Sequence, residues 1–208
     1  MNLLVLGATG GTGQLVVSQA LAAGHAVTAL VRTPAKLSAQ GPRLRVVAGS
    51  VTDSTAIAQV VAAQDAVIST LGRGWSLKSE HLFERAVPLL LSEMEAAGVR
   101  RLIFTSAIGV GEAYAEAPLY SRMAIRFFLS DLYADKLIAE NLIRRSRCDW
   151  TIVQPAQLTN GALTRRYRSG EHLRETGMPK IAKADVADFL LRQLDDQTSV
   201  RKIIRLAY

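Results

Sequence analysis

Short apolar runs alternate with amphipathic stretches along nearly the whole chain of 208 residues. The runs have the length of strands that are buried on both faces, and the stretches between them repeat apolar residues at helical spacing. Strands are expected at residues 2–6, 26–31, 43–47, 65–70, 100–105 and 201–206. Strands that alternate with helices predict a doubly wound α/β fold with a mainly parallel sheet, in a single domain over residues 1–208.

Helices are expected between these strands. The first follows residues 7–13, a second runs through residues 57–61 behind an N-cap at Asp53 or Ser54, and longer ones cover residues 80–97 and 127–145. Pro88 predicts a kink or a boundary within the third helix, and Gly98 predicts its end.

A glycine-rich stretch lies directly after the first strand and directly before the first helix. It reads Gly7-Ala8-Thr9-Gly10-Gly11-Thr12-Gly13. Strand, glycine-rich turn and helix in this order open a dinucleotide-binding βαβ unit. Gly7 permits the tight turn, Gly10 lets a pyrophosphate approach the backbone, and Gly13 lets the helix pack closely on the sheet. Free amides and the dipole at the helix N-terminus then favour an anion.

Two segments carry a family resemblance: G-A-T-G-G-T-G at residues 7–13, and G-H-A-V-T-A-L-V-R at residues 24–32. They resemble the atypical short-chain dehydrogenase/reductases with an NAD(P)-binding NmrA-like domain, closest to the flavin reductase/biliverdin reductase B type. Residues 149–157 are similar to the sixth strand of that family, and residues 181–192 to its closing segment, with Asp185 as N-cap or first-turn acid of the last helix. The resemblance implies a Rossmann fold whose substrate side is built from loops and the C-terminal third. We expect the strand order 3-2-1-4-5-6, which the last strand can extend.

The end of the second strand bears on the choice between NAD(H) and NADP(H). Dinucleotide folds that prefer NAD usually place an acidic residue there, whereas an arginine accommodates a 2′-phosphate. This chain has Arg32-Thr33, with Lys36 a turn further on, and no acidic residue. NADP(H) is therefore the expected cofactor, with Arg32 on its 2′-phosphate.

Further cofactor contacts are expected at the carboxyl edge of the sheet, where open α/β sheets bind ligands. Val51 can pack on the adenine, although Ser50 replaces the aspartate that family members usually carry. Leu71-Gly72 leaves the fourth strand, and the glycine allows close approach to the ribose and pyrophosphate. The remaining expected contacts are Thr105, Lys136 and Pro155.

Three residues are candidates for catalysis: Ser106, Tyr133 and Lys136. The resemblance places the active-site serine of the family at Ser106, whose alternative role is to satisfy backbone groups at a strand end. Typical short-chain dehydrogenases carry Tyr-x-x-x-Lys on the next helix, where the ammonium binds ribose and lowers the tyrosine pKa. Here Tyr133 and Lys136 are three residues apart, which still makes them neighbours on a helix. The alternative partner of Lys136 is Glu140, at i+4.

Trp75, Tyr120 and Gln157 are expected on the substrate side. Trp75 and Tyr120, with Tyr114 and Phe127, form either a stacking surface or a cover for the core or an oligomer contact. Gln157 aligns with a pocket histidine of biliverdin reductase B-like members, but an amide cannot exchange a proton near neutral pH. The usual Arg-Pro of the family is Gln154-Pro155 here, which leaves the charge preference for the substrate open.

Composition narrows the class of protein. The single Cys148 excludes an internal disulfide and fits a reducing cytoplasm, and the scattered His25, His81 and His172 indicate no metal site. The N-terminal apolar run lacks a basic leader, so neither a signal peptide nor a membrane span is expected. The net charge of +7 accompanies no nucleic-acid-binding motif, and we interpret it as solvated surface and attraction for a polyanionic cofactor.

The leading hypothesis is an NADPH-dependent reductase that passes hydride to a flavin-, quinone- or tetrapyrrole-like acceptor, working as a monomer or homodimer. Such an aromatic or conjugated acceptor can take its second proton from solvent, so an altered Tyr/Lys pair is tolerable. A redox-sensing NADP(H)-binding protein of the NmrA type is a second hypothesis, favoured by the missing Tyr-x-x-x-Lys. A carbonyl reductase or epimerase that uses Tyr133 is a third.

Overall fold

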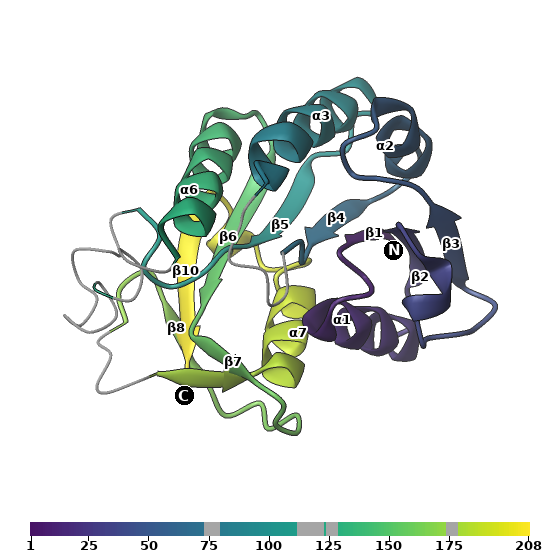
Figure 1. The fold of residues 1–208 in the computed structure, drawn as a ribbon. Helices are drawn as coiled ribbons and strands as arrows, with labels where there is room; N and C mark the ends of the chain where they lie inside the picture. The colour runs from purple at the N-terminus through teal and green to yellow at the C-terminus, as the bar shows by residue number, and fades with distance from the viewer. Residues whose placement is uncertain (73–79, 112–122, 124–128, 174–178) are drawn as a thin grey trace.

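The structure is a computed structural model, and it describes residues 1–72, 80–111, 123, 129–173 and 179–208. An eight-stranded sheet with the order β3-β2-β1-β4-β5-β6-β10-β8 forms its centre (Figure 1). Its strands are β1 (Asn2–Leu6), β2 (Ala26–Val31), β3 (Leu44–Ala48), β4 (Ala66–Ser69), β5 (Arg101–Thr105), β6 (Asp149–Pro155), β8 (Arg168–Gly170) and β10 (Lys202–Ala207). All neighbours are parallel except β8, which runs antiparallel to β10. The expected order and its extension by the last strand are confirmed.

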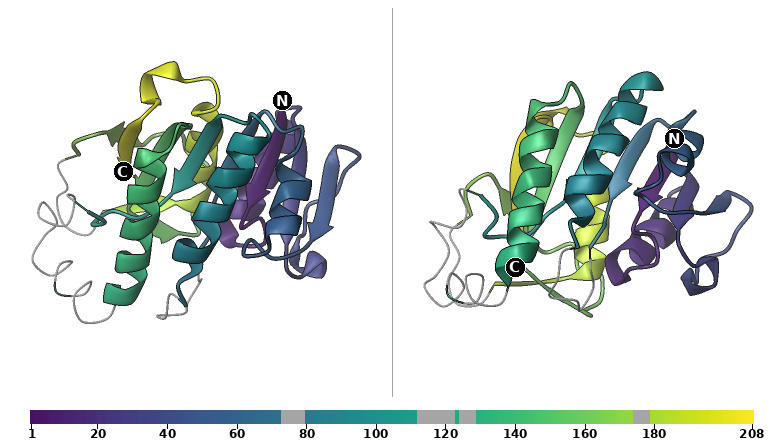
Figure 2. Two further views of the ribbon diagram at one scale, coloured as in Figure 1. Left: turned by 90° about the horizontal axis from the view of Figure 1, so that it is seen from above. Right: turned by 45° about the horizontal axis from the view of Figure 1, so that its top comes forward.

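Helices cover both faces of this sheet (Figures 1 and 2). One face carries α1 (Gly11–Ala22) and α7 (Lys183–Arg192), and the other carries α2 (Ser54–Val61), α3 (Leu82–Ala96) and α6 (Ser130–Arg145). Two short 3-10 turns, η1 (Pro34–Lys36) and η3 (Gln197–Ser199), lie in connections. Within the described residues, no helix is long and apolar enough to cross a membrane.

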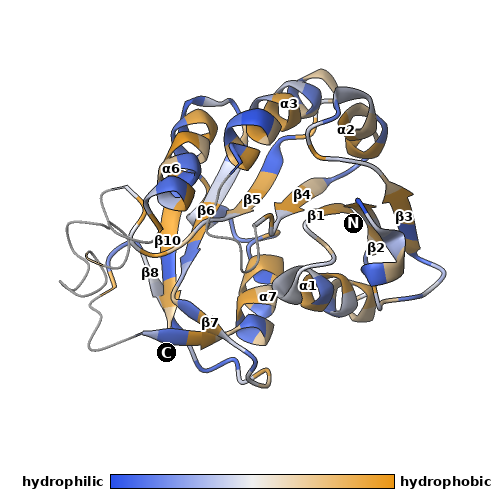
Figure 3. Ribbon diagram, viewed as in Figure 1, coloured by the Kyte–Doolittle hydropathy of each residue, from blue (hydrophilic) through white to orange (hydrophobic). Residues whose placement is uncertain are grey.

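The central strands are buried on both faces, which gives the molecule two hydrophobic cores. In β1, Leu3 and Val5 pack on the side of α1 and α7, whereas Leu4 and Leu6 pack on the side of α2, α3 and α6. Figure 3 shows the resulting concentration of hydrophobic residues along the inner strands. Burying each such side chain contributes about 1.5–3 kcal/mol, so the strands are fixed by continuous apolar runs rather than by alternation.

Several local expectations are confirmed and one boundary is corrected. Asp53 caps α2, because its Oδ1 accepts hydrogen bonds from the amides of Thr55 and Ala56. Gly98 follows the end of α3 in the left-handed region, at φ +71°. Pro88 lies inside α3, so it does not mark a boundary.

The expected strand over residues 149–157 is wrong at its end, because the chain changes sheets there. The amide of Ala156 still bonds to Leu206 of β10, but the amide of Gln157 bonds to Pro179 instead. Gln157 therefore begins β7 (Gln157–Thr159), which pairs in parallel with β9 (Lys180–Ala182) in a separate two-stranded sheet. This switch carries the chain away from the main sheet at the edge where ligands bind in open α/β folds.

Residues 160–167, which join β7 to β8 and which we call the strap, are tied to the first turn of α7. Asp185, which is fully buried, accepts hydrogen bonds from the amides of Thr164 and Arg165 and from the hydroxyls of Thr164 and Tyr208, at 2.7–2.8 Å. Burial alone would raise the pKa of Asp185, but these hydrogen bonds outweigh it and lower the pKa. Asp185 lies in the first turn of α7, as expected, but its carboxylate binds the strap and does not cap the helix.

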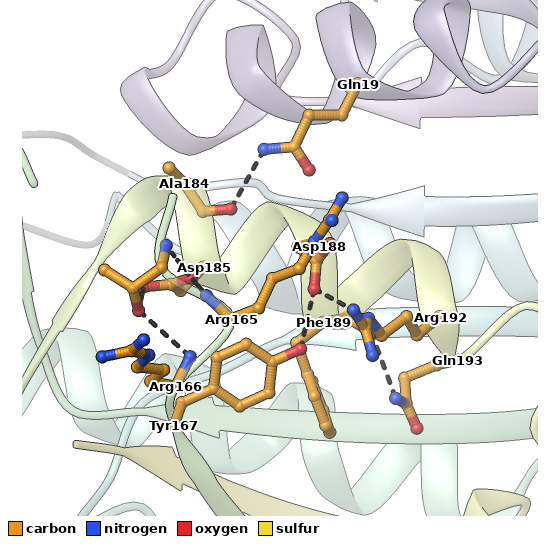
Figure 4. Close-up of polar contacts among 11 residues, drawn as sticks. Gln19, Arg165, Arg166, Tyr167, Ala184, Asp185, Asp188, Phe189, Arg192 and Gln193 are labelled. Atoms are coloured by element: carbon orange, nitrogen blue, oxygen red, sulfur yellow. Dashed lines mark hydrogen bonds and ion pairs between the residues drawn. The ribbon is translucent and has the colours of Figure 1, made fainter. Parts of the chain in front are cut away.

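One turn further along α7, Asp188 makes a second attachment (Figure 4). Its carboxylate accepts from Arg165 Nε at 2.9 Å, from the Tyr167 hydroxyl at 2.8 Å and from Arg192 Nε at 2.8 Å. The strap is therefore held in a defined position on α7 by two carboxylates that lie three residues apart on one helix face.

Candidate dinucleotide site

The turn between β1 and α1 is too tight for any side chain at two of its glycines. Gly7 has φ +78°, and a Cβ atom added there would lie 2.6 Å from the carbonyl oxygen of Thr70. A Cβ atom on Gly13 would lie 2.1 Å from the carbonyl oxygen of Gly7. The Thr70 hydroxyl donates to the carbonyls of Leu6 at 3.0 Å and Gly7 at 3.3 Å, and so joins the ends of β1 and β4. These contacts bring α1 against the sheet.

The same turn leaves backbone amides open at the N-terminus of α1. The Gly10 amide closes the turn on the Gly7 carbonyl at 2.9 Å, and no side chain caps the helix, whose first turn contains no acidic residue. Gly10 and Gly11 are exposed, whereas the side chains of Ala8 and Thr12 are buried. Thr9 accepts a hydrogen bond at its carbonyl from the Gln14 amide group. A helix start without cap or acid is suited to bind an anion through its free N–H groups.

The expected cofactor residues of the first half lie at the same edge of the sheet. Arg32 follows β2, Val51 follows β3, and Leu71-Gly72 follows β4, all at carboxyl ends of parallel strands. Arg32 is exposed and makes no hydrogen bond or ion pair within the described residues. Val51 and Leu71 pack partly buried on the core beneath α2 and α3, and Gly72 is exposed. These residues line an edge that starts at the glycine-rich turn.

Two buried hydroxyl groups lie at the end of β5. Thr105 and Ser106 are 9% and 5% exposed; among the described residues the Thr105 hydroxyl has no hydrogen-bond partner, and the Ser106 hydroxyl has none besides the neighbouring carboxyl group of Glu140. The Ser106 amide already donates to Val153 at 2.7 Å. The alternative role of Ser106, to satisfy backbone groups with its hydroxyl, is therefore not fulfilled in this part of the structure. Buried hydroxyls without partners are rare and mark sites where a ligand or water completes the bonding.

A buried polar group lies behind Ser106. Glu140 is 2% exposed and accepts a hydrogen bond at 3.0 Å from the Gln154 amide group, which also bonds the Val110 carbonyl. Burial raises the pKa of Glu140, while the neighbouring Ser106 hydroxyl, the Gln154 amide and the charges of Lys136 and Arg144 oppose the rise. Gln154, where the family usually has arginine, thus gives Glu140 a neutral partner instead of a cation.

Lys136 is half-buried and faces an aromatic ring. Its ammonium lies 4.9 Å from the centre of the Phe83 ring. Burial lowers its pKa to about 8, although the negative charges of Glu140 and Asp135 oppose the shift. Asp135 itself caps α3, since its oxygens accept from the amides of Phe83 and Glu84 at 3.0 and 2.9 Å. The start of α3 and the middle of α6 are thereby held together beside Ser106.

Tyr133 has a different neighbour. Its hydroxyl donates a hydrogen bond of 3.1 Å to the carbonyl of Ile108, and burial raises the pKa of the phenol. A tyrosine that acts as an acid in a short-chain dehydrogenase needs the opposite, a phenol whose pKa a nearby ammonium lowers. Tyr133 therefore contacts the turn after β5 and makes no pair with Lys136.

Of the remaining residues expected at the cofactor or the substrate, Pro155 and Gln157 are described by the structure and the aromatic residues are not. Pro155 is the buried last residue of β6, and its carbonyl accepts from the Ile108 amide at 3.2 Å. The side chain of Gln157 is exposed on β7. Trp75 and Tyr120, together with Tyr114 and Phe127, lie outside the described residues.

The sequence patterns do not predict two contacts of the site. One is the cap that Asp135 makes on α3, and the other is the pair of hydrogen bonds from the Thr70 hydroxyl to the carbonyls of Leu6 and Gly7. In the sequence Asp135 stands only within the Tyr133–Lys136 spacing, and Phe83, whose amide it accepts, lies 52 residues earlier. No local pattern signals such a contact. The sequence suggests Glu140 only as a surface partner of Lys136. Its spacing of three residues from the apolar Ile143 on the same helix face is the one pattern that indicates its burial.

A doubly wound sheet, with an uncapped helix behind a glycine-rich turn at its carboxyl edge, defines a dinucleotide-binding protein of the Rossmann type. The chain belongs to the NAD(P)H-binding family, whose model matches residues 7–197. The expected NAD(P)-binding domain is thus confirmed.

Two curated relatives are similar to this chain at modest identity. The photosystem II assembly factor Ycf39 of Synechocystis is 26% identical over 217 residues, covering 97% of this chain and 61% of that protein. A UPF0659 protein of Saccharomyces cerevisiae is 28% identical over 219 residues, covering 99% of this chain and 92% of that protein. The chain thus spans less than two thirds of Ycf39 but nearly the whole yeast relative.

Solved structures share the fold. The oxidoreductase ylbE of Lactococcus lactis superposes with a TM-score of 0.83 at 22% identity, covering 99% of this chain and 90% of that chain. ChuY of Escherichia coli O157:H7, described as an anaerobillin reductase, gives 0.82 at 22% identity, covering 99% and 96%. A short-chain dehydrogenase/reductase of Veillonella parvula in complex with NADP gives 0.81 at 18% identity, covering 100% and 94%.

Proposed function

We propose that this protein is an NADPH-dependent reductase that passes hydride to a flavin-, quinone- or tetrapyrrole-like acceptor. The observation that carries the proposal is the bond between the Tyr133 hydroxyl and the Ile108 carbonyl. It occupies the phenol that a carbonyl-reducing dyad would need as its proton donor. A conjugated acceptor can accept hydride and draw its second proton from solvent, so it does not require such a donor.

The preference for NADPH is supported by charge at the end of β2. Arg32 is exposed and has no partner within the described residues, and Lys36 lies exposed in η1. An arginine in this place can bind a 2′-phosphate, and no carboxylate follows β2 to bind a ribose 2′-hydroxyl. The ChuY neighbour, which is described as an anaerobillin reductase, agrees with a reductase of this kind.

Each group of residues would have a distinct task. The amides that begin α1 would hold the pyrophosphate, and the cradle fits it because Gly7, Gly10 and Gly13 keep side chains out. NADPH supplies the hydride when it is bound. Lys136 would bind the ribose, and the buried hydroxyl of Ser106 would orient the nicotinamide or the acceptor. The substrate side would be built from loops and the C-terminal third, with Gln157 exposed toward it.

The test is direct. Purified protein is mixed with NADPH and with a panel of flavins, quinones, tetrapyrroles and aldehydes, and nicotinamide absorbance is followed. Turnover with at least one conjugated acceptor, and none with simple aldehydes, is the expected result. Turnover with aldehydes alone would contradict the proposal and would support a carbonyl reductase.

A sensor of the NmrA type is the second candidate, because the bond of Tyr133 to Ile108 would equally suit a protein that binds NADP(H) without turnover. The same panel separates the two. Tight NADPH binding without consumption of NADPH by any acceptor would favour the sensor.

A further inference from the structure

The side chain of the first residue of α7 lies against the first residue of α1. Lys183 begins α7, and its side chain crosses Gly11, which begins α1. A Cβ atom added to Gly11 would lie 3.0 Å from Cδ and 3.1 Å from Nζ of Lys183. The ammonium of Lys183 is therefore at the glycine-rich turn, although the two residues are far apart in sequence. The same ammonium donates a hydrogen bond of 2.7 Å to Oδ1 of Asn160 in the strap.

This arrangement gathers positive charge at one place. The N-terminus of a helix carries partial positive charge, and the ammonium of Lys183 adds its own charge beside the N-terminus of α1. The first turn of α1 contains no acidic residue, and Lys183 forms no ion pair within the described residues. Asp185 is the acid of the first turn of α7, but its oxygens are occupied by Thr164, Arg165 and Tyr208.

The ammonium also has unused hydrogen-bonding capacity. An ammonium group can donate three hydrogen bonds and can accept none. Lys183 donates one of its three to the neutral side chain of Asn160. Among the described residues nothing accepts from the other two hydrogens, which lie next to the amides that begin α1. The absence of a side chain at Gly11 is what lets the lysine stem lie there, because a Cβ atom would crowd Cδ and Nζ.

We propose that Lys183 is a cofactor-binding residue that contacts the pyrophosphate of the dinucleotide from the side of α7, opposite the amides of α1. The inference rests on membership of the NAD(P)H-binding family and not on the identity of the acceptor. In this arrangement α7 joins the cofactor site, and Asn160 orients the ammonium from the strap. A lysine acts on a phosphate as a point charge with adaptable donors, which suits an approach from one side.

The experiment compares Lys183→Met with Lys180→Met, which removes an exposed positive charge three residues earlier on β9. Calorimetry measures the dissociation constants of three ligands. NADPH and 2′-phospho-ADP-ribose contain the pyrophosphate, whereas adenosine 2′-monophosphate does not. Thermal unfolding checks that each variant is folded, and Lys183→Arg tests whether the charge alone is sufficient.

Lys183→Met should weaken binding of NADPH and of 2′-phospho-ADP-ribose about tenfold, which is the usual effect of a lost charge-assisted hydrogen bond. It should leave adenosine 2′-monophosphate within about twofold, and Lys183→Arg should retain most of the affinity. Lys180→Met should leave all three ligands unchanged. Unchanged NADPH affinity in folded Lys183→Met would overturn the proposal, as would an equal loss for all three ligands.

A double-mutant cycle gives a second, independent readout. Gly11→Ala places a methyl group against the flexible end of Lys183, so the lysine must move while the helix keeps its backbone. If Gly11→Ala weakens NADPH binding by displacing Lys183, it should have less effect in the Lys183→Met background. Fully additive losses would contradict the assignment.

Discussion

The hydroxyl of Tyr133 lies 3.1 Å from the carbonyl oxygen of Ile108 and donates its hydrogen to it. This bond joins α6 to the turn that follows β5, which is also held by the bond of the Ile108 amide to Pro155. Burial raises the pKa of the phenol of Tyr133 above its usual value, which favours the protonated form. Tyr133 thus supports the turn beside Ser106, and we propose that it does not serve as an acid.

The first prediction concerns catalysis by Tyr133. Tyr133→Phe should leave turnover with an active acceptor within a few-fold of wild type, because the phenol is bonded to backbone. Loss of one hydrogen bond should cost about 0.5–1.5 kcal/mol of unfolding free energy. Steady-state kinetics and urea unfolding measure both effects. A positioned proton donor contributes roughly 10²–10⁴-fold, and a loss of that size would show that Tyr133 is the acid.

The second prediction concerns the choice of cofactor. Wild type should bind NADPH more tightly than NADH, by about tenfold to a hundredfold, since a charge-assisted hydrogen bond is worth roughly 1.5–3 kcal/mol. Arg32→Ala should remove most of that preference without changing the affinity for NADH. Calorimetric titration with both nucleotides measures the ratio. Equal affinities in the wild type would contradict the assignment of Arg32 to the 2′-phosphate.

The third prediction concerns the pH dependence of stability. Burial lowers the pKa of Lys136 from 10.5 to about 8 in the folded state. Between these values the unfolded chain binds more protons than the folded one, so this residue makes the free energy of unfolding rise with pH. The rise should be at most about 3 kcal/mol, and Lys136→Met should lack it. Urea unfolding of both proteins at pH 7.5 and pH 10 measures the difference, and parallel pH profiles would contradict it.

The fourth prediction concerns the glycine-rich turn. Gly13→Ala puts a methyl group 2.1 Å from the carbonyl oxygen of Gly7. A backbone carbonyl cannot move aside as the end of a flexible side chain can. We expect a loss of at least 1–3 kcal/mol, roughly the cost of overpacking, together with loss of NADPH binding. Gly72→Ala is the matched control for stability alone, since no described atom lies within 4 Å of the added methyl group. Equal melting temperatures for the two variants would refute this account of the turn.

Local features of the sequence predicted the cofactor half of the fold well. The turn at Gly7–Gly13 and the N-cap at Asp53 depend on residues that are neighbours in sequence, so their patterns are visible there. The continuous apolar runs of the inner strands likewise predicted their burial and, with the family resemblance, their order.

Contacts between distant segments were beyond such reasoning. Asp135 caps α3 through the amide of Phe83, which lies 52 residues earlier, and Asp185 binds the strap rather than its own helix. The switch of sheets at Gln157 depends on which backbone partner is nearest, Leu206 or Pro179, and the apolar pattern continues through it unchanged. The helical spacing placed Tyr133 beside Lys136, but tertiary contacts turned the two side chains to different partners.

Anaerobic oxidation of NADPH by the wild-type protein tests the central claim most directly. One flavin, one quinone, one tetrapyrrole and one aldehyde are supplied separately, and loss of nicotinamide absorbance is compared with the amount of acceptor reduced. The account predicts that at least one conjugated acceptor is reduced with one NADPH consumed per hydride transferred, and that the aldehyde is not. Binding of NADPH without oxidation by any acceptor, or oxidation with the aldehyde alone, would contradict it.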